Sequence, residues 1–441
     1  MFTKISGWGN SLHSLSLIKT LSQENPVVNE VNSRGAIPRG LGRSYGDSAN
    51  NSGGTVLYAG GFNHKYIDPQ SGIAVVGAGV TLHALESDGL KIGYFPFVVP
   101  GTAEVTIGGA IASDIHGKSH HRVGSFSNHL IEMKLLTAEG SLRVMKPIGE
   151  NSRLFWATVG GMGLTGVIIE ATIQLLKVET AFVTVKEKRV FSLEELLKVL
   201  LEFNSKHTYT VAWIDLSGSF KGKGIVSAAD HAKLEHIPTK NHTKILNPIN
   251  LKSFRIPFTL KNGLINRFTI RVFNLFWFHK PLGKKIQHVQ KYMHPLDGIT
   301  NWNVLYGAKG FTQYQFVVPL NRVEVLGVIL EKLKNENCSS FLAVLKSFGN
   351  SPTGLIGFPM IGWTLAIDIP NNARNLSQIL REIDQLVMNA GGRIYLTKDS
   401  RLNNKHLPLM YPNLDEWKEI KQEIDPSNYW QSDQGRRLKL C

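Results

Sequence analysis

An α+β fold is predicted for this 441-residue chain by a contrast between its two halves. Up to about residue 177 the sequence is rich in glycine and in short β-like runs such as GIAVVGAG at residues 72–79, which indicates strands joined by tight turns. The remainder alternates amphipathic helical patterns with β-like runs, which indicates a sheet covered by helices. Hydrophobic residues make up 42% of the chain, enough for a substantial core, and the length suggests two or three domains.

Three helical patterns stand out in the second half. They are SLEELLKVLLEF from Ser192, NRVEVLGVILEKL from Asn321 and NLSQILREIDQLVMNAGG ending near Gly391. Ser192 and Asn321 are expected to be N-caps, because their side chains accept hydrogen bonds from free amides, and Gly391 or Gly392 is expected at the C-terminus. The β-like runs between the helices are TYTVAWIDL, FTQYQFVVPL, FLAVLKSF and GWTLAIDIP.

The cysteine content and the hydropathy pattern limit the class of protein. Cys338 and Cys441 are too few for a disulfide framework or a cysteine-based metal site, so we expect a reducing compartment and no metal. The N-terminus lacks the apolar core of a signal peptide, and no run of about 18 uncharged apolar residues is present. A soluble or peripheral protein is therefore expected.

The net charge of +15 favours an anionic partner. Between Glu235 and Asp297 there is no acidic residue, and eleven basic residues lie there: Lys240, Lys244, Lys252, Arg255, Lys261, Arg267, Arg271, Lys280, Lys284, Lys285 and Lys291. Residues 247–285 also contain Phe254, Phe258, Phe268, Phe273, Phe276, Trp277 and Phe278. This composition suits a membrane-docking segment or a solvated loop, whereas no recognised nucleic-acid motif accompanies it.

The first motif with chemical content is RGLGRSYGD at residues 39–47. Three glycines within seven positions let successive backbone N–H groups converge on one anion, which suits a pyrophosphate. The spacing G-x-G-x-x-x-G is not that of a Rossmann fingerprint, and no Walker P-loop occurs. Taken alone, the segment is equally compatible with a surface turn.

Two further glycine-rich segments follow. In PGTAEVTIGGAIASDIHG, residues 100–117, small side chains would let the backbone approach a flat ring closely, although tight packing between secondary-structure elements is the alternative. The segment WATVGGMGLTG, residues 156–166, precedes a β-like run at residues 167–175. Alone it carries little information.

Together, in this order and spacing, the three segments resemble the FAD-binding domain of the vanillyl-alcohol oxidase superfamily. A closer resemblance, to the decaprenylphosphoryl-ribose oxidase family, rests on RGLGRSYGDSA, GGAIASDIHGKSHH, FWATVGGMGLTG, FTQYQFVVP, YLTKDSR and SDQGRRLKL and runs almost from end to end. It implies two lobes: a PCMH-type FAD-binding domain at 1–177 and a substrate-binding domain on an antiparallel sheet at 178–392. Residues 393–441 are then expected to return to the FAD-binding domain.

The resemblance implies non-covalent FAD. In superfamily members with covalent flavin a histidine often follows the glycine loop, and here that place holds Arg43-Ser44-Tyr45; a link through His116 is the alternative. The residues that the resemblance implies for FAD binding are Pro38, Arg39, Gly40, Leu41, Gly42, Arg43, Ser44, Tyr45, Gly46, Asp47, Ser48, Gly101, Thr106, Ile107, Gly108, Gly109, Ser113, Asp114, Ile115, His116, Ile168 and Tyr395.

Lys398 is the expected catalytic residue. Alcohol oxidation needs a hydride acceptor, which flavin supplies, and a group that takes the hydroxyl proton. A lysine does this only where burial or a nearby cation lowers its pKa, and the alternative is a surface lysine paired with Asp399. The resemblance favours the buried lysine, since the matching lysine of the family lies by the flavin.

His116 is expected to orient the sugar or share the proton, or else to be a packed histidine.

The resemblance also implies a substrate pocket formed by Tyr45, Trp213, Tyr306, Gln315, Lys346, Asp368 and Lys398. Lys346 interrupts the apolar run FLAVLKSF, so it is either a ligand-facing cation suited to a phosphate or an outward residue of an alternating strand. Ala366 stands where the mycobacterial pocket has a cysteine, and Thr364 replaces a nearby asparagine. Capture of nitroaromatic inhibitors at Ala366 is therefore not expected.

The activity implied by the resemblance is oxidation of the 2-prime hydroxyl of a polyprenylphosphoryl-ribose. A separate NAD(P)H-dependent reductase would convert the keto sugar to the arabinose form used in the cell envelope, and oxygen or a quinone-type acceptor would reoxidise the flavin. A lipid-linked substrate implies a peripheral enzyme at the inner membrane, with the cytoplasmic face preferred to the periplasmic one. The alternatives are an aldonolactone or sugar-alcohol oxidase and a flavin-binding scaffold without turnover.

Overall fold

Two sheets organise the N-terminal part of the computed structural model, which describes residues 2–23, 31–217, 222–238, 244–249, 254–256, 261, 263–338 and 340–441. The first has the order β1-β2-β4-β3 and the second β5-β6-β10-β8-β9. Strands β2, β3 and β4 run parallel, whereas the second sheet is antiparallel. The strands are β1 (Phe2–Ser6), β2 (His13–Ser22), β3 (Ala36–Arg39), β4 (Thr55–Gly61), β5 (Lys65–Ile67), β6 (Ile73–Gly77), β8 (Leu130–Leu136), β9 (Leu142–Met145) and β10 (Val167–Gln174).

Helices in this part were not predicted. They are α1 (Leu82–Lys91), α2 (Ile107–Ala112), α3 (His120–Val123) and α4 (Ser152–Thr158), and the short strands β7 (Tyr94–Phe95) and β11 (Leu176–Lys177) pair beside them. Thr81 caps α1 by accepting a hydrogen bond from the Ala84 amide, but Gly89 inside the helix weakens the sequence pattern. Glycine-rich α2 begins at Thr106, whose hydroxyl accepts from Gly109 N at 3.2 Å.

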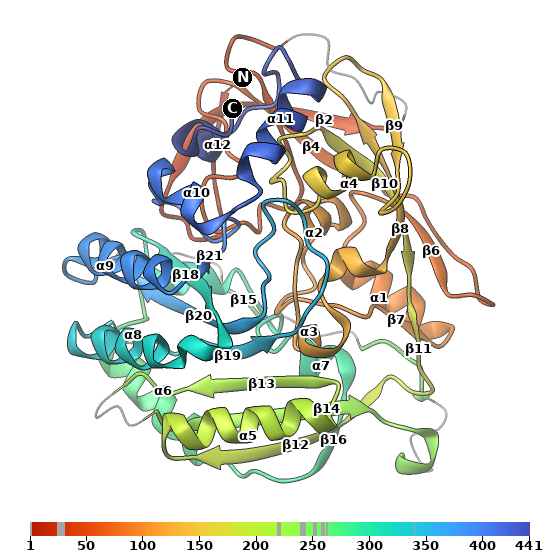
Figure 1. The fold of residues 1–441 in the computed structure, drawn as a ribbon. Coiled ribbons are helices and arrows are strands. Elements are labelled where there is room, and N and C mark those ends of the chain that lie inside the picture. Colours follow the sequence, from red (N-terminus) through yellow and green to blue (C-terminus); the bar gives the residue numbers. More distant parts are fainter. Residues whose placement is uncertain are drawn as a thin grey trace.

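An eight-stranded antiparallel sheet forms the second part, with the order β16-β12-β14-β13-β19-β20-β18-β21 (Figure 1). Its strands are β12 (Phe182–Val190), β13 (Tyr209–Ile214), β14 (Gly224–His231), β16 (Lys285–His288), β18 (Phe311–Val318), β19 (Ala343–Phe348), β20 (Gly362–Pro370) and β21 (Arg393–Ile394). The four β-like runs of the second half are thus strands β13, β18, β19 and β20. The predicted α+β class is confirmed.

The two faces of this sheet have different partners. Cross-strand neighbours Ala212, Leu345, Leu365 and Phe316 form one fully buried row. They share a core with helices α5 (Leu193–Lys206), α8 (Val323–Asn335) and α9 (Leu376–Asn389), which cover that face. The residues that alternate with this row point to the opposite face, toward the N-terminal part.

Two of the three predicted helix ends are confirmed. The Ser192 hydroxyl accepts from Glu195 N at the start of α5, and Gly391 follows α9 with φ of +72°. Asn321 as an N-cap is wrong: the chain turns at Pro319 into a 3-10 segment, Leu320–Arg322, and α8 begins only after it.

Four further helices and strands belong to the second part. They are α6 (Arg267–His279), α7 (Val289–Met293), β15 (Phe254–Arg255) and β17 (Ile299–Thr300). Lys240, Lys252 and Phe258, and the side chains of Phe254 and Arg255, lie outside the described residues.

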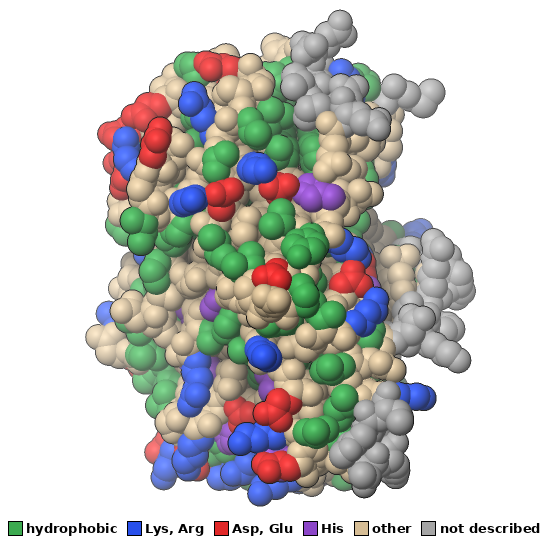
Figure 2. All heavy atoms as spheres, turned by 90° about the vertical axis from the view of Figure 1, so that its right-hand side faces the viewer, with side chains coloured by type: hydrophobic (Ala, Val, Ile, Leu, Met, Phe, Trp, Pro, Cys, Tyr) green, Lys and Arg blue, Asp and Glu red, His purple; other side chains and the backbone are tan. Residues whose placement is uncertain are grey.

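On the face shown in Figure 2, hydrophobic, basic and acidic side chains are interspersed. Within the described residues no helix is long and apolar enough to cross a membrane.

The C-terminal segment lies against the N-terminal sheets, and both chain ends are at the top of Figure 1. Its helices are α10 (Leu407–Met410), α11 (Leu414–Ile424) and α12 (Asp433–Leu438). Just before α12, Trp430 bridges to Ala36 at the start of β3. Asp433 accepts hydrogen bonds from the amide and hydroxyl of Ser52, at 2.9 and 2.8 Å. The segment after β21 is therefore part of the N-terminal half in space.

Candidate functional site

A cavity of about 1350 Å³ lies between the N-terminal sheets and the open face of the eight-stranded sheet. Its walls contain residues from all three glycine-rich segments, although these are far apart in the sequence. On the opposite wall, Trp213, Val344, Ala366 and Gln315 form a cross-strand row over β13, β19, β20 and β18. The sequence motifs and the sheet residues thus meet around one space.

The first glycine loop is shaped to hold an anion. Residues 38–45 all line the cavity. The amide N–H groups of Leu41, Gly42, Arg43 and Ser44 donate no hydrogen bond within the described part of the chain. Gly42 adopts φ of +66°, a backbone conformation that favours glycine and turns the loop. The Arg43 guanidinium stacks on Trp8 at 4.0 Å and adds positive charge. These groups fit a pyrophosphate.

The second and third segments lie beside this loop because their side chains are small. A Cβ on Gly40 would overlap the Thr106 hydroxyl, and one on Gly108 would lie 3.0 Å from the Ala78 Cβ. Gly101 differs, since it lines the cavity and no atom lies within 4 Å of its Cβ position. Other expected FAD residues that line the cavity are Ser48, Thr106, Gly109, Ser113, Ile115, His116, Ile168 and Tyr395.

Four expected FAD residues do not line the cavity: Gly46, Asp47, Ile107 and Asp114. Ile107 points into the hydrophobic core. The Asp114 carboxylate accepts from Ser127 N at 3.3 Å and from the Thr353 hydroxyl at 3.1 Å. These two side chains hold the walls of the cavity in place.

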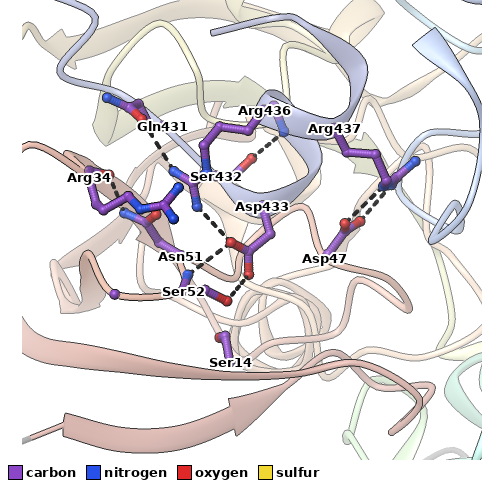
Figure 3. Close-up of polar contacts among 12 residues, drawn as sticks. Ser14, Arg34, Asp47, Asn51, Ser52, Gln431, Ser432, Asp433, Arg436 and Arg437 are labelled. Carbon is purple, nitrogen blue, oxygen red and sulfur yellow. Dashed lines mark hydrogen bonds and ion pairs between the residues drawn. The ribbon is translucent and has the colours of Figure 1, made fainter.

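Gly46 and Asp47 instead connect the glycine loop to the turn that carries Lys398. A Cβ on Gly46 would overlap the carbonyl oxygen of Asp399, and Tyr45 N donates to Thr397 O at 3.0 Å. Arg437 of α12 forms ion pairs with both Asp47, at 2.7 Å, and Asp399, at 2.9 Å. Figure 3 shows Arg437 pointing toward Asp47, while Asp433 of the same helix points to Ser52.

Lys398 lines the cavity, and its ammonium lies 3.8 Å from the centre of the Tyr45 ring. Because Asp399 pairs with Arg437 and accepts from the amides of Arg401 and Leu402, it is not the partner of Lys398. Burial lowers the pKa of Lys398 to about 7, with Lys346 contributing and Asp368 opposing. A free amine is therefore present near neutral pH.

His116 is a neutral acceptor at the same wall. Its Nε2 lies 2.8 Å from the Gln315 amide nitrogen, which places the ring proton on Nδ1. Burial holds the pKa of His116 well below its usual value, and Lys346, His120 and Lys398 lower it further. The ring packs against Phe348, Phe358 and Tyr395, with centroids 4.8, 5.4 and 5.1 Å away. The histidine is thus both packed and adjacent to the cavity.

The other expected substrate residues fall into two groups. Tyr45, Trp213, Gln315 and Lys346 line the cavity, as does Ala366, and Thr364 accepts a hydrogen bond from Gln315 at 3.2 Å. Burial lowers the pKa of Lys346 to about 8, and Lys346 is a cavity-facing residue of an alternating strand.

Tyr306 and Asp368 do not line the cavity. Tyr306 stacks on Phe311 at 4.1 Å, in an aromatic cluster with Trp302. Asp368 is fully buried because Gln313 covers it, donating to Oδ1 at 2.6 Å. Burial raises the pKa of Asp368 to about 7, while its charge acts on Lys398.

The comparisons with known proteins agree with this geometry. A family model described as an FAD binding domain matches residues 26–146. The chain is 39% identical to decaprenylphosphoryl-beta-D-ribose oxidase of Mycolicibacterium smegmatis, over 99% of this chain and 97% of the relative. This chain belongs to the decaprenylphosphoryl-beta-D-ribose oxidase family. It is an FAD-dependent oxidoreductase.

Two further relatives match smaller shares of this chain. An uncharacterized protein of Streptomyces coelicolor is 34% identical over 82% of this chain and 100% of its own length. A D-lactate dehydrogenase of Archaeoglobus fulgidus is 29% identical, over 28% of each chain.

Sequence reasoning missed several charged residues that line the cavity, among them Lys118. It lines the cavity, its ammonium donates to Met293 O at 2.8 Å, and burial lowers its pKa to about 7. Its position directly after the second glycine segment, in HGKSHH, was the available signal. Glu187, Lys280 and Lys285 were also missed as lining residues; the carboxylate binds both ammonium groups, at 3.0 and 2.9 Å.

Replacing Arg437 should destabilise the protein and loosen the cofactor. Arg437→Gln would leave the Asp47 and Asp399 carboxylates buried without their cation, at a cost of about 3 kcal/mol. The expected result is a lower unfolding midpoint in urea together with weaker FAD retention on gel filtration. The matched control is Arg153→Gln, because its acidic neighbours lie 3.8 and 4.0 Å away in solvent and the change should cost about 0.5 kcal/mol or less. Equal effects of the two changes would contradict the assignment.

Filling the open position at Gly101 should remove FAD without unfolding the chain. In Gly101→Val the new side chain is added at a residue that lines the cavity, and it meets no protein atom within 4 Å of its Cβ. Flavin absorbance of the purified protein should be lost, with the unfolding midpoint unchanged relative to FAD-free protein. Gly298→Val is the control, since that Cβ position is also open but the residue does not line the cavity, and it should remain yellow.

Proposed function

We propose that the chain oxidises the 2-prime hydroxyl of a polyprenylphosphoryl-ribose to the keto sugar. The observation that carries this proposal is the position of Lys398, whose amine lies in a cavity between the glycine loops and further cations. The family relative named decaprenylphosphoryl-beta-D-ribose oxidase supports the choice of substrate. Oxidation of a sugar hydroxyl near neutral pH needs a base that is unprotonated there. A lysine with a pKa of about 7 meets that requirement.

Lys398, Tyr45 and His116 have separate roles in the proposed reaction. Bound FAD supplies the acceptor for the hydride that leaves the alcohol carbon. The free amine of Lys398 takes the hydroxyl proton at Nζ, and the Tyr45 ring then lies against the ammonium that forms. His116, neutral and bonded to Gln315, orients the sugar by hydrogen bonding. The Tyr45 phenol stays protonated, because burial raises its pKa well above 10.

Other lining residues of the cavity suit the phosphate and the lipid. Lys118 and Lys346 provide ammonium groups in a partly desolvated space, where phosphate oxygens form strong charge-assisted hydrogen bonds. The lining also contains the apolar side chains of Phe273, Trp277 and Ile286, together with Glu187, Lys280 and Lys285. A prenyl chain would lie against these apolar side chains.

The remaining expectations form part of the same proposal. The molecule would be two-lobed, with an FAD-binding domain at 1–177, a substrate domain at 178–392 and a C-terminal segment at 393–441. FAD would bind non-covalently, through the residues of the three glycine segments. The enzyme would be peripheral, at the cytoplasmic face of the inner membrane, and an NAD(P)H-dependent reductase would convert its product to the arabinose form.

The proposal is tested by Lys398→Met. The variant should keep its FAD, since the hydrophobic stem of the side chain is preserved, but it should lose about 10²–10⁴-fold in kcat. The measurement is anaerobic bleaching of flavin absorbance on adding polyprenylphosphoryl-ribose in detergent. Bleaching of the wild type by soluble aldonolactones alone would favour a soluble-substrate oxidase. No bleaching of the wild type by any sugar would favour a scaffold.

The pH profile should respond in opposite directions to two substitutions near Lys398. Since the free amine is the base, kcat should rise with pH and reach half its maximum near pH 7. Asp368→Asn removes a charge that raises the pKa of Lys398, so the midpoint should fall; Lys346→Met removes a charge that lowers it, so the midpoint should rise. Each shift should be about 0.5–1 pH unit. Shifts in the same direction would contradict Lys398 as the titrating base.

A further inference from the structure

Helix α6 is held to the eight-stranded sheet by one narrow stripe of side chains. Of its thirteen residues, only Ile270, Asn274 and Phe278 are buried. Asn274 donates to Asp215 Oδ1 at 2.7 Å and to Ser340 O at 3.1 Å, and Phe278 packs against Trp213 and Ile225. The stripe follows the i, i+4, i+8 spacing of one helix face. The orientation of α6 is thus fixed by specific contacts.

The opposite face of α6 is apolar and exposed. Phe268 and Phe276 are each 74% exposed and Leu275 is 56% exposed, and all three lie on the side away from the buried stripe. A helix that only covers the sheet would carry polar residues there. Exposed aromatic side chains gathered on one element indicate a partner that covers them.

The charged residues on and around α6 indicate the kind of partner that covers its apolar face. The chain has no acidic residue between Glu235 and Asp297, and Arg267 and Arg271 are exposed on α6 beside its apolar face. Aromatic side chains flanked by cations, without carboxylates, match the interface of an anionic bilayer. On the face shown in Figure 2, by contrast, acidic side chains are interspersed with the basic and hydrophobic ones.

We propose that the exposed face of α6, formed by Phe268, Leu275, Phe276 and their flanking arginines, docks on the surface of an anionic lipid bilayer. This inference rests on the proposed function, because a lipid-linked substrate must be taken from such a surface. Docking through α6 would give the enzyme a fixed orientation on the membrane.

The orientation follows from a third side of the same helix. Phe273 and Trp277 lie between the buried and the docking faces and line the cavity, and both are partly exposed. Lys280, directly after the helix, lies over the Trp277 ring at 3.9 Å and also lines the cavity. Docking through Phe268 and Phe276 therefore brings the mouth of the cavity to the headgroup level. The prenyl chain of a substrate can enter there without crossing water.

The experiment measures binding of the full-length, FAD-loaded protein to vesicles. Wild type should sediment with phosphatidylglycerol–phosphatidylcholine vesicles and bind at least tenfold more weakly to phosphatidylcholine alone. The double variant Phe268→Ser, Phe276→Ser should lose at least tenfold in binding. Arg267→Gln with Arg271→Gln should reduce the preference for anionic lipid and its salt dependence. The control is Ile148→Ser with Leu409→Ser, two side chains 85% and 69% exposed outside α6, which should bind as wild type.

Turnover separates this inference from the proposed function. On a short-chain polyprenylphosphoryl-ribose in detergent, the Phe268→Ser, Phe276→Ser variant should match wild type within twofold, whereas with vesicle-embedded long-chain substrate its rate should fall at least tenfold. Normal vesicle binding by that variant, or a wild-type dimer in light scattering that it dissociates, would overturn docking while leaving the oxidase intact. Vesicle binding without turnover of any polyprenylphosphoryl-ribose would instead overturn the proposed function.

Discussion

The paired contacts of Arg437 with Asp47 and Asp399 are the constraint on which the geometry of the site depends. One carboxylate belongs to the loop whose amides face the pyrophosphate space, and the other follows Lys398. A single cation from α12 therefore fixes the distance between the cofactor loop and the candidate base. The close approach of Gly46 to Asp399 O serves the same purpose, because no side chain separates the two segments.

Several lysines are buried together at the cavity, and this lowers their pKa values. Lys118, Lys346 and Lys398 are all desolvated, and each loses basicity as a result. The positive charges that favour phosphate binding also disfavour protonation of the Lys398 amine, so this amine is available as a base before the substrate arrives. An anionic ligand then restores the charge balance. Asp368 moderates this effect from beside Gln313, where its charge acts on Lys398 although the residue does not line the cavity.

Local sequence patterns predicted the second half of the fold better than the first. Apolar alternation and caps located strands β13, β18, β19 and β20, the start of α5 and the C-terminal end of α9, because these elements bury one regular face. Helix α2 was missed, since its glycines serve close packing and not helix stability. For the site, motifs predicted which segments meet, but tertiary contacts decide which side chains face the cavity: Asp47 and Tyr306 turn away, and Lys118 turns in.

The antiparallel sheet explains how residues so far apart in the chain come to line one cavity. Alternation places Ala212, Leu345 and Leu365 under the helices and Trp213, Val344 and Ala366 in the cavity, in two registered rows. Because the helices stabilise one row, the other can vary in chemistry without loss of the fold. Ala366 and Thr364 lie on this second face. Substrate preference can therefore change there while Lys398 and the glycine loop, held by Arg437, remain in place.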